Sequence, residues 1–171
     1  MDWIFSYGSF VQDWDIDYDK RTKGTLKGYH RDFNVRSVLK WGEPGFPAPV
    51  LGLEEEEGTE CEGIVFGSSE EKSMVSEMKQ RNDPVYRLRK DTVFLEDDEV
   101  EAHFFMNDPE HESYIGDVPL DKRAEMCLET SGKEGRASDH VYGVKERLEE
   151  FDIEDEYVES FVERLEELQN P

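Results

Sequence analysis

The sequence has few basic residues and lacks any long apolar run. Lys and Arg number 20 against 43 Asp and Glu, so the formal net charge of the 171 residues is −23. A surface this acidic disfavours nucleic acid and anionic membranes as partners, because both are bound mainly through Lys and Arg. No apolar stretch approaches the roughly 20 residues that span a bilayer, and the N-terminus lacks the basic and apolar segments of a signal peptide. We therefore expect a cytoplasmic protein.

Cysteine and histidine are also scarce. Cys61 lies in an apolar, strand-like segment and Cys127 on the apolar side of a helical one, so we expect two buried free thiols. The four histidines are scattered along the chain: His30, His103, His111 and His140. Because zinc sites place Cys or His at short spacings, the sequence predicts no metal site.

The acidic residues are spread along the chain, with runs at 54–57 and 96–99. Three explanations are open: adaptation to high salt, a docking surface for a basic partner, and solubility alone. This distribution of acidic residues along the whole chain favours a general property of the surface over a single docking patch. Concentrated salt would screen the self-repulsion, since the Debye length falls to about 3 Å at 1 M. We favour a salt-rich cytoplasm.

The chain nevertheless contains enough apolar sequence for a compact core, with 36% hydrophobic and 12% aromatic residues. No repeat, linker or change of composition divides it, so we expect a single domain over residues 1–171. Alternating apolar residues predict strands near 3–5, 24–28, 31–38, 49–53 and 60–66, with turns at 29–30 and 54–60. A hairpin is predicted over 91–106, with its turn at 96–99.

Helical periodicity follows in four places. Ser68 and Ser69 are good N-cap residues for a helix through about Gln80, and Glu71 completes a capping-box pattern with Ser68. The last third of the chain carries three apolar stripes at helical spacing. They are Leu120, Ala124, Cys127 and Leu128; Val141, Val144, Leu148 and Phe151; and Val158, Phe161, Val162, Leu165 and Leu168.

The segment WIFSYGSF at 3–10 combines an apolar strand with a Gly-Ser turn. Gly8 lets the backbone approach a ligand closely, because it has no Cβ. Successive free N–H groups in such a turn form a nest for a carboxylate or phosphate. Gly and Ser are also ordinary turn residues, so a plain turn that packs Tyr7 is the competing interpretation.

Five segments, in order, resemble the ChaC-like γ-glutamylcyclotransferases: WIFSYGSF (3–10), LKGYHRDF (26–33), CEGIVF (61–66), YIGDVPL (114–120) and GRASDHV (135–141). The family usually has Gly where Ser6 stands and Leu where Phe10 stands. The resemblance implies an α+β fold, in which a small, strongly curved and mostly antiparallel sheet or barrel has helices packed around it. It also implies a small-molecule γ-glutamyl or carboxylate ligand.

A γ-glutamylcyclotransferase releases 5-oxoproline by letting the α-amine of its substrate attack the γ-carbonyl of the same molecule. The protein must hold the bent γ-glutamyl group, and the orientation supplies much of the rate. One carboxylate must move a proton from the amine to the leaving amide. The resemblance therefore implies no metal and no organic cofactor.

The family's catalytic Glu lies in a pattern that this chain matches at Arg81 and Tyr86, but the Glu position holds Asn82. An amide is no general base near neutral pH, and losing such a group costs about 10²- to 10⁴-fold in rate. Asp83 is a candidate substitute, although it is one residue further on and one methylene shorter. A shifted alignment in which Glu77 serves is a second alternative, and a protein that binds its ligand without turnover is a third.

The resemblance implies a site where residues 7–10 and 81–86 converge. The predicted substrate-binding residues are Tyr7, Gly8, Ser9, Phe10, Ser37, Tyr86 and Tyr114. The function expected first is a γ-glutamylcyclotransferase acting on glutathione or a related compound. The alternatives are a weak or inactive relative that binds a small carboxylate, and an acidic interaction protein that keeps only the fold. A monomer and a homodimer are both open.

Overall fold

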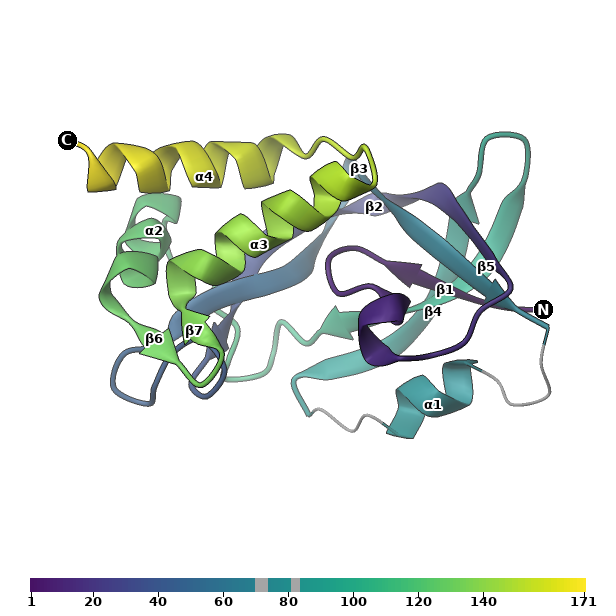
Figure 1. Cartoon of the computed structure of the whole chain (residues 1–171), viewed down its shortest axis with the longest axis horizontal. Helices are drawn as coiled ribbons and strands as arrows, with labels where there is room; N and C mark the ends of the chain where they lie inside the picture. Colours follow the sequence, from purple (N-terminus) through teal and green to yellow (C-terminus); the bar gives the residue numbers. More distant parts are fainter. Residues whose placement is uncertain (70–73, 81–83) are drawn as a thin grey trace. The chain divides into compact units, whose positions relative to one another are not determined.

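The computed structural model describes residues 1–69, 74–80 and 84–171, which form two compact units (Figure 1). The first unit contains residues 1–30 and 55–106, and the second contains 31–54 and 107–171. A closed barrel has the strand order β1-β3-β2-β4-β5. Its strands are β1 (Asp2–Ser6), β2 (Lys20–Ser37), β3 (Ala48–Ser68), β4 (Tyr86–Phe94) and β5 (Glu99–Asn107). Both units contain residues of β2 and β3, and the last residue of β5 belongs to the second unit. With its helices, this confirms the predicted α+β class, whereas the single domain stays a prediction.

In the first unit, β1 joins the strands at its two sides. It pairs antiparallel with β3, from Asp2 opposite Ser68 to Ser6 opposite Ile64, and parallel with β5 at Ile4 opposite His103. Its apolar residues enter a core that includes Ile4, Phe5, Leu26, Phe66, Val93 and Phe104, none of them more than 2% exposed. Burial of such side chains removes apolar area from water and stabilises the unit.

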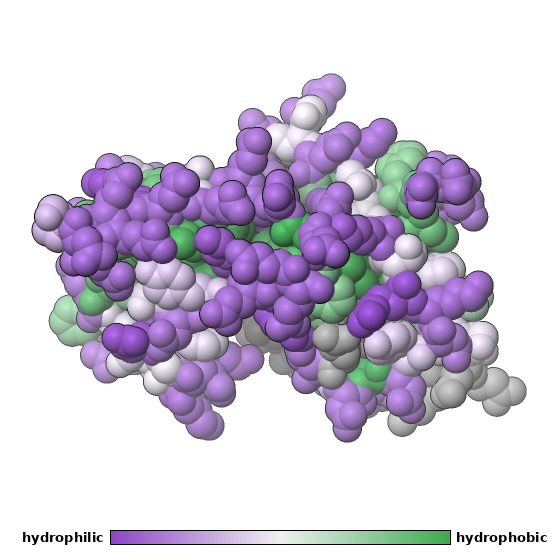
Figure 2. All heavy atoms as spheres, turned by 45° about the horizontal axis from the view of Figure 1, so that its top comes forward, coloured by the Kyte–Doolittle hydropathy of each residue, from purple (hydrophilic) through white to green (hydrophobic). Residues whose placement is uncertain are grey.

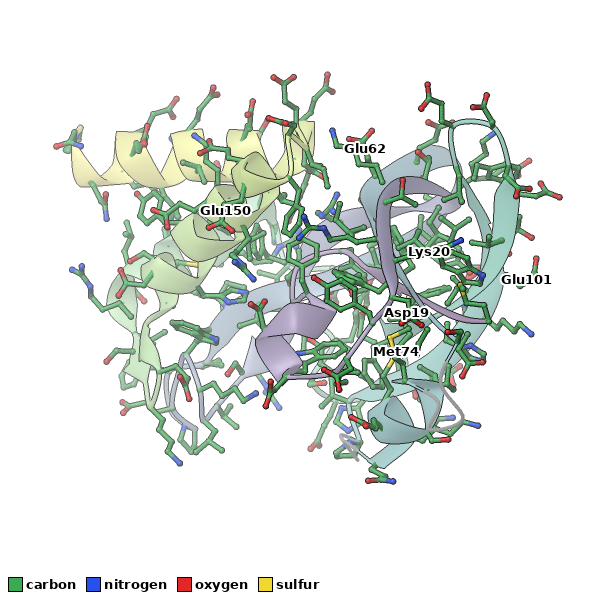
Figure 3. The ribbon with its side chains drawn as sticks, turned by 45° about the vertical axis from the view of Figure 1, so that its right-hand side comes forward. Asp19, Lys20, Glu62, Met74, Glu101 and Glu150 are labelled. Atoms are coloured by element: carbon green, nitrogen blue, oxygen red, sulfur yellow. The ribbon has the colours of Figure 1, made fainter. Side chains whose placement is uncertain are left out.

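Helix α1 (Met74–Gln80) packs against β1 and buries Met74, Val75 and Met78, as the predicted stripe required. Figure 3 shows the Met74 side chain pointing from α1 toward the barrel strands. Ser68 is the last residue of β3, so its predicted role as an N-cap was wrong. The N–H and hydroxyl of Ser69 instead donate to the Asp19 carboxylate, at 2.6 and 2.7 Å. Glu71, the other half of the predicted capping box, lies outside the described residues.

Two of the predicted turns were wrong, because β2 runs through residues 29–30 and β3 through 54–60. Gly28 and Gly58 have φ values of +88° and +89°. Glycine adopts this left-handed region at no steric cost, so each strand bends there without ending. Tyr29 is 6% exposed and packs edge-on against Phe104, as a strand residue facing the core. The predicted hairpin is confirmed in β4 and β5, and β4 begins earlier than predicted.

The second unit contains three helices that pack against one another: α2 (Leu120–Glu129), α3 (Ala137–Glu150) and α4 (Glu156–Gln169). A short hairpin, β6 (Ser131–Gly132) and β7 (Gly135–Arg136), connects α2 to α3. The predicted helical stripes are largely buried. Leu120, Phe151 and Leu168 are half-buried. Leu128 is exposed, at 37%, and Arg123 of the same helix is buried.

Polar residues of β2 explain why Arg123 is buried. The sequence predicted a half-buried strand here, but Arg31, Asp32 and Asn34 are buried together with their apolar neighbours. The Arg123 guanidinium pairs with Asp32, and the Tyr157 hydroxyl donates to the same carboxylate oxygen at 2.7 Å. Arg31 pairs with Asp155 at 2.8 Å. Because each buried charge has an opposite partner, these pairs fix β2 against α2 and α4 within the unit.

The two thiols are buried and free, as predicted for Cys61 and Cys127, and burial raises the pKa of the Cys127 thiol to about 12. Polar and charged residues cover most of the face shown in Figure 2. In the described part of the chain, no helix combines the length and apolar character needed to cross a membrane. Over the same residues, no three His, Cys, Asp or Glu side chains are grouped as metal ligands would be.

Candidate functional site

The turn after β1 (residues 7–10) is held at both of its ends. The Tyr7 hydroxyl donates to the Phe105 carbonyl oxygen on β5 at 2.6 Å. The Phe10 N–H donates to Asp13 Oδ2 at 3.1 Å, and the Asp13 N–H donates back to the Phe10 carbonyl oxygen at 2.8 Å. Asp13 belongs to η1 (Val11–Trp14), a short 3₁₀ helix. The turn is therefore anchored to the barrel by Tyr7 and to η1 by Phe10.

Between these anchors, Gly8 is half-buried and Ser9 is exposed. Phe10 is 0% exposed and packs against Phe66, with the ring centroids 6.5 Å apart. Its side chain supports the turn by packing against Phe66 of β3, and its N–H is already occupied by Asp13. The predicted nest of free N–H groups is therefore limited to Gly8 and Ser9.

We expect Tyr7→Phe to destabilise the protein by about 1 kcal/mol, because the buried side of the turn loses one hydrogen bond to Phe105. Urea unfolding followed by tyrosine and tryptophan fluorescence measures this loss. Tyr142→Phe is the matched control, since the Tyr142 hydroxyl bonds Gln169 in an exposed position at 3.2 Å. Equal stability of the two variants would show that Tyr7 does not anchor the turn.

The segment predicted to carry the catalytic group is only partly described. Tyr86 is the first residue of β4 and is half-buried. Arg81, Asn82 and Asp83 lie outside the described residues. Glu77 is half-buried on α1, beside the buried Met78.

Ser37 and Tyr114, the other predicted contacts, belong to the second unit. Ser37 ends β2, and its Oγ accepts a hydrogen bond from the Trp41 N–H at 3.3 Å, as expected for a serine that stabilises a strand end. Tyr114 lies beside β2, where it forms a β-bridge with Val35. The next residue, Ile115, donates its N–H to the Asn34 carbonyl oxygen at 2.8 Å. Tyr114 is thereby fixed by backbone pairing as well as by its side chain.

Tyr114 belongs to a group of residues around the Glu54 carboxylate that the sequence did not predict. The Tyr114 hydroxyl donates to Glu54 Oε1 at 2.5 Å, and Asn34 Nδ2 donates to the same oxygen at 2.9 Å. Asn34 Nδ2 also donates to the Leu53 carbonyl oxygen at 2.9 Å. A Cβ on Gly116 would lie 2.6 Å from Glu54 Oε1 and closer still to the Tyr114 hydroxyl, so only glycine fits there. We call Asn34, Glu54, Tyr114 and Gly116 the Glu54 cluster.

The pKa of Tyr114 indicates which group donates the hydrogen bond to Glu54 in this cluster. Burial, and then the hydrogen bond to Glu54, raise the pKa of Tyr114 well above its usual value. Tyr114 therefore keeps its proton at every pH of interest and always acts as the donor toward Glu54. The arrangement fixes a carboxylate by one of its two oxygens, without a cation.

The family model of ChaC-like protein matches residues 2–168 of the chain. The chain belongs to this family. The resemblance carried by the five sequence segments is thus confirmed over nearly the whole length.

Three relatives are distant in sequence, and each match covers most of the chain and a smaller share of the relative. The chain is 25% identical over 168 residues to γ-glutamylcyclotransferase 2-1 of Arabidopsis thaliana, and the alignment covers 91% of the chain and 78% of that protein. It is 26% identical over 160 residues to the glutathione-specific γ-glutamylcyclotransferase of Escherichia coli strain K12, covering 90% and 68%. A glutathione-specific γ-glutamylcyclotransferase 1 of Danio rerio is 27% identical over 156 residues, covering 87% and 78%.

A solved structure shows the same fold. The glutathione-specific γ-glutamyl cyclotransferase from yeast matches with a TM-score of 0.84 at 15% identity, covering 99% of both chains. This confirms the predicted γ-glutamylcyclotransferase-like fold of the ChaC-family chain.

Proposed function

We propose that this ChaC-family protein is a γ-glutamylcyclotransferase, which converts glutathione or a related small γ-glutamyl compound into 5-oxoproline. The observation that carries the proposal is the family match over residues 2–168, together with the activity named for the relatives. The anchored turn at residues 7–10 adds a local argument, because it presents Gly8 and Ser9 from a rigid strand end.

In the proposed reaction, the γ-glutamyl group binds in a bent conformation. The backbone at Gly8 and Ser9 would hold its α-carboxylate through N–H groups and the Ser9 hydroxyl. Binding in this shape holds the α-amine against the γ-carbonyl of the same molecule, so the intramolecular attack starts from a fixed, reactive geometry. The reaction forms the ring C–N bond, breaks the γ-amide C–N bond and otherwise moves only protons, so the proposal includes no metal and no organic cofactor. Ser37, Tyr86 and Tyr114 stay predicted substrate contacts.

A second candidate function is favoured by Asn82, which stands at the family's Glu position. An amide accepts no proton near neutral pH, so a protein that relied on this position alone would bind a small carboxylate ligand without turning it over. An active enzyme needs another carboxylate, and Asp83 is the neighbouring candidate.

Three proteins distinguish these possibilities in an assay of 5-oxoproline release from glutathione and γ-glutamylcysteine: wild type, Asn82→Glu and Asp83→Ala. Wild-type activity that Asp83→Ala abolishes would place the catalytic carboxylate at Asp83. A silent wild type that gains turnover through Asn82→Glu would identify a binding protein with an intact pocket. If neither wild type nor Asn82→Glu releases 5-oxoproline, the cyclotransferase function is ruled out.

We further propose that the protein works in a salt-rich cytoplasm. The net charge of −23 supports this, because self-repulsion destabilises a compact chain and concentrated salt screens it. The assay above is therefore made at low and at molar salt.

A further inference from the structure

Ser6, the last residue of β1, has a buried hydroxyl group without a partner. The residue is only 3% exposed, and its Oγ makes no hydrogen bond among the described residues. Burying a hydroxyl group without a hydrogen bond costs free energy, so nearly all buried hydroxyl groups in proteins are paired. An alanine would fill this place beside Ile4 and Phe5 without that cost. The hydroxyl of Ser6 therefore needs an explanation other than packing.

The pairing of β1 shows which face of the sheet carries the Ser6 side chain. Ser6 and Ile4 are two residues apart on one strand, so their side chains lie on the same face. Ile4 is paired with Phe66 of β3 and with His103 of β5, and paired residues share a face. Ser6 thus lies on the face that carries Phe66 and, two residues beyond His103, Phe105.

The chain that leaves β1 returns over this same face. Phe10, at the end of the turn, packs against Phe66, with the ring centroids 6.5 Å apart. Trp14 of η1 packs edge-on against Phe105, with the ring centroids 6.1 Å apart. Figure 1 shows this reversal, in which the chain turns back after β1 and enters η1. All of these residues belong to the first unit, so the unpaired hydroxyl of Ser6 lies beneath the turn at residues 7–10.

The turn itself carries further unpaired donors. The backbone N–H groups of Gly8 and Ser9, and the Ser9 hydroxyl, make no hydrogen bond to any described residue. The ends of the turn are fixed, because the side chain of Tyr7 and the N–H of Phe10 are both bonded. With Ser6, four hydrogen-bond donors within four consecutive residues are left for a ligand. Such a concentration of donors suits an anionic oxygen, as in a carboxylate.

We propose that Ser6 is a specificity-determining residue, whose hydroxyl donates to the α-carboxylate of the γ-glutamyl substrate from beneath the turn. This assignment rests on the proposed cyclotransferase function, in which Gly8 and Ser9 hold the same carboxylate from above. Hydrogen bonds to an ionised acceptor are the strong ones, and a buried hydroxyl is shielded from competing water. The donors select a free α-carboxylate over its amide, because the amide NH₂ group offers them no acceptor.

Ser6→Ala removes the donor and leaves the shape of the strand unchanged. We expect kcat/KM for 5-oxoproline release from γ-glutamylcysteine to fall about 10- to 100-fold, the effect of losing a hydrogen bond to a charged group. The loss should appear mainly in KM, since the carboxylate is bound equally before and during the reaction. The preference for γ-glutamylcysteine over its α-amide should fall by a similar factor. Ser131→Ala is the control for activity, since Ser131 is exposed on β6.

Thermal stability separates recognition of a ligand from a structural role. A hydroxyl that has no partner in the protein should be removed without loss, so the thermal midpoint of Ser6→Ala should equal or exceed that of wild type. Ser113→Ala is the matched control for stability. Ser113 is also buried, at 7% exposed, but its hydroxyl is bonded to His111 Nδ1 at 2.8 Å, so its variant should be less stable. A midpoint for Ser6→Ala as low as that of Ser113→Ala would overturn the assignment.

The outcomes for Ser6 and for the proposed function can be told apart. If wild type is active and Ser6→Ala keeps both its KM and its preference for the free carboxylate, the assignment is overturned while the cyclotransferase function stands. If wild type binds γ-glutamylcysteine in calorimetry without turnover, Ser6→Ala must weaken that binding at least tenfold, and unchanged binding overturns the assignment. If wild type neither releases 5-oxoproline nor binds γ-glutamylcysteine, both proposals fail.

Discussion

Asp32→Ala should destabilise the protein by about 3–5 kcal/mol, the cost of leaving a buried charge without its partner. The side chain of Arg123 is 7% exposed, and its guanidinium pairs with Asp32. Arg123 also donates to the Phe33 carbonyl oxygen at 3.0 Å, which holds its side chain in place. Tyr157 loses its acceptor as well. Urea unfolding at neutral pH measures the difference.

Two further variants separate this ion pair from an ordinary surface contact. Asp121→Ala removes an exposed partner of Arg164 and should cause a much smaller loss. Replacing both Asp32 and Arg123, by Leu and Met, removes both charges and should recover much of the stability lost in Asp32→Ala. An Asp32→Ala protein as stable as Asp121→Ala would contradict the buried ion pair.

His140 should make the protein less stable as the pH falls from about 6.5 to about 4. Its half-buried ring packs against Phe33 and Trp41, and its Nε2 accepts the Leu51 N–H at 3.1 Å. Burial lowers the pKa of His140 from 6.5 to about 4. Between these values the unfolded chain binds a proton that the folded protein does not. Protonation therefore favours unfolding, and the full loss is about 3 kcal/mol.

The measurement compares wild type with His140→Gln, whose carbonyl oxygen can accept the Leu51 N–H. Both proteins are unfolded in urea at pH 7 and at pH 4.5. The acidic residues contribute equally to the pH dependence of unfolding free energy in both proteins. The difference between the two proteins therefore isolates the contribution of His140. Wild type should lose more stability than His140→Gln over this range. Equal losses would show that the folded protein accommodates a protonated His140.

Local patterns predicted most elements of the fold but not the two long strands. The β4–β5 hairpin and the helical stripes depend on residues close in sequence, and these predictions were confirmed. The predictions of turns at 29–30 and 54–60 were wrong because a glycine beside polar residues is also the usual pattern of a turn. Gly28 and Gly58 bend β2 and β3 without ending them. Whether such a strand continues depends on pairing with distant strands.

The candidate sites differ in how far the sequence could reveal them. The turn at Tyr7 was predictable because a strand followed by Gly-Ser is a local signal. The Glu54 cluster was not, since Tyr114 lies 60 positions from Glu54. Glu54 also begins a run of four identical residues, and only the strand register distinguishes it from the exposed Glu55. Asp32 and Arg123 were missed for the same reason, because their pairing joins β2 to a helix 91 positions away.

The most direct test of the proposed function is the stoichiometry of the wild-type reaction. The protein is incubated with γ-glutamylcysteine and with glutathione at low and at molar salt, and 5-oxoproline and the released amine are quantified by mass spectrometry. We predict one 5-oxoproline and one released amine for each γ-glutamyl compound consumed, with greater activity at molar salt. Protein that is folded by circular dichroism at molar salt, yet forms no 5-oxoproline from either compound, would contradict the cyclotransferase function.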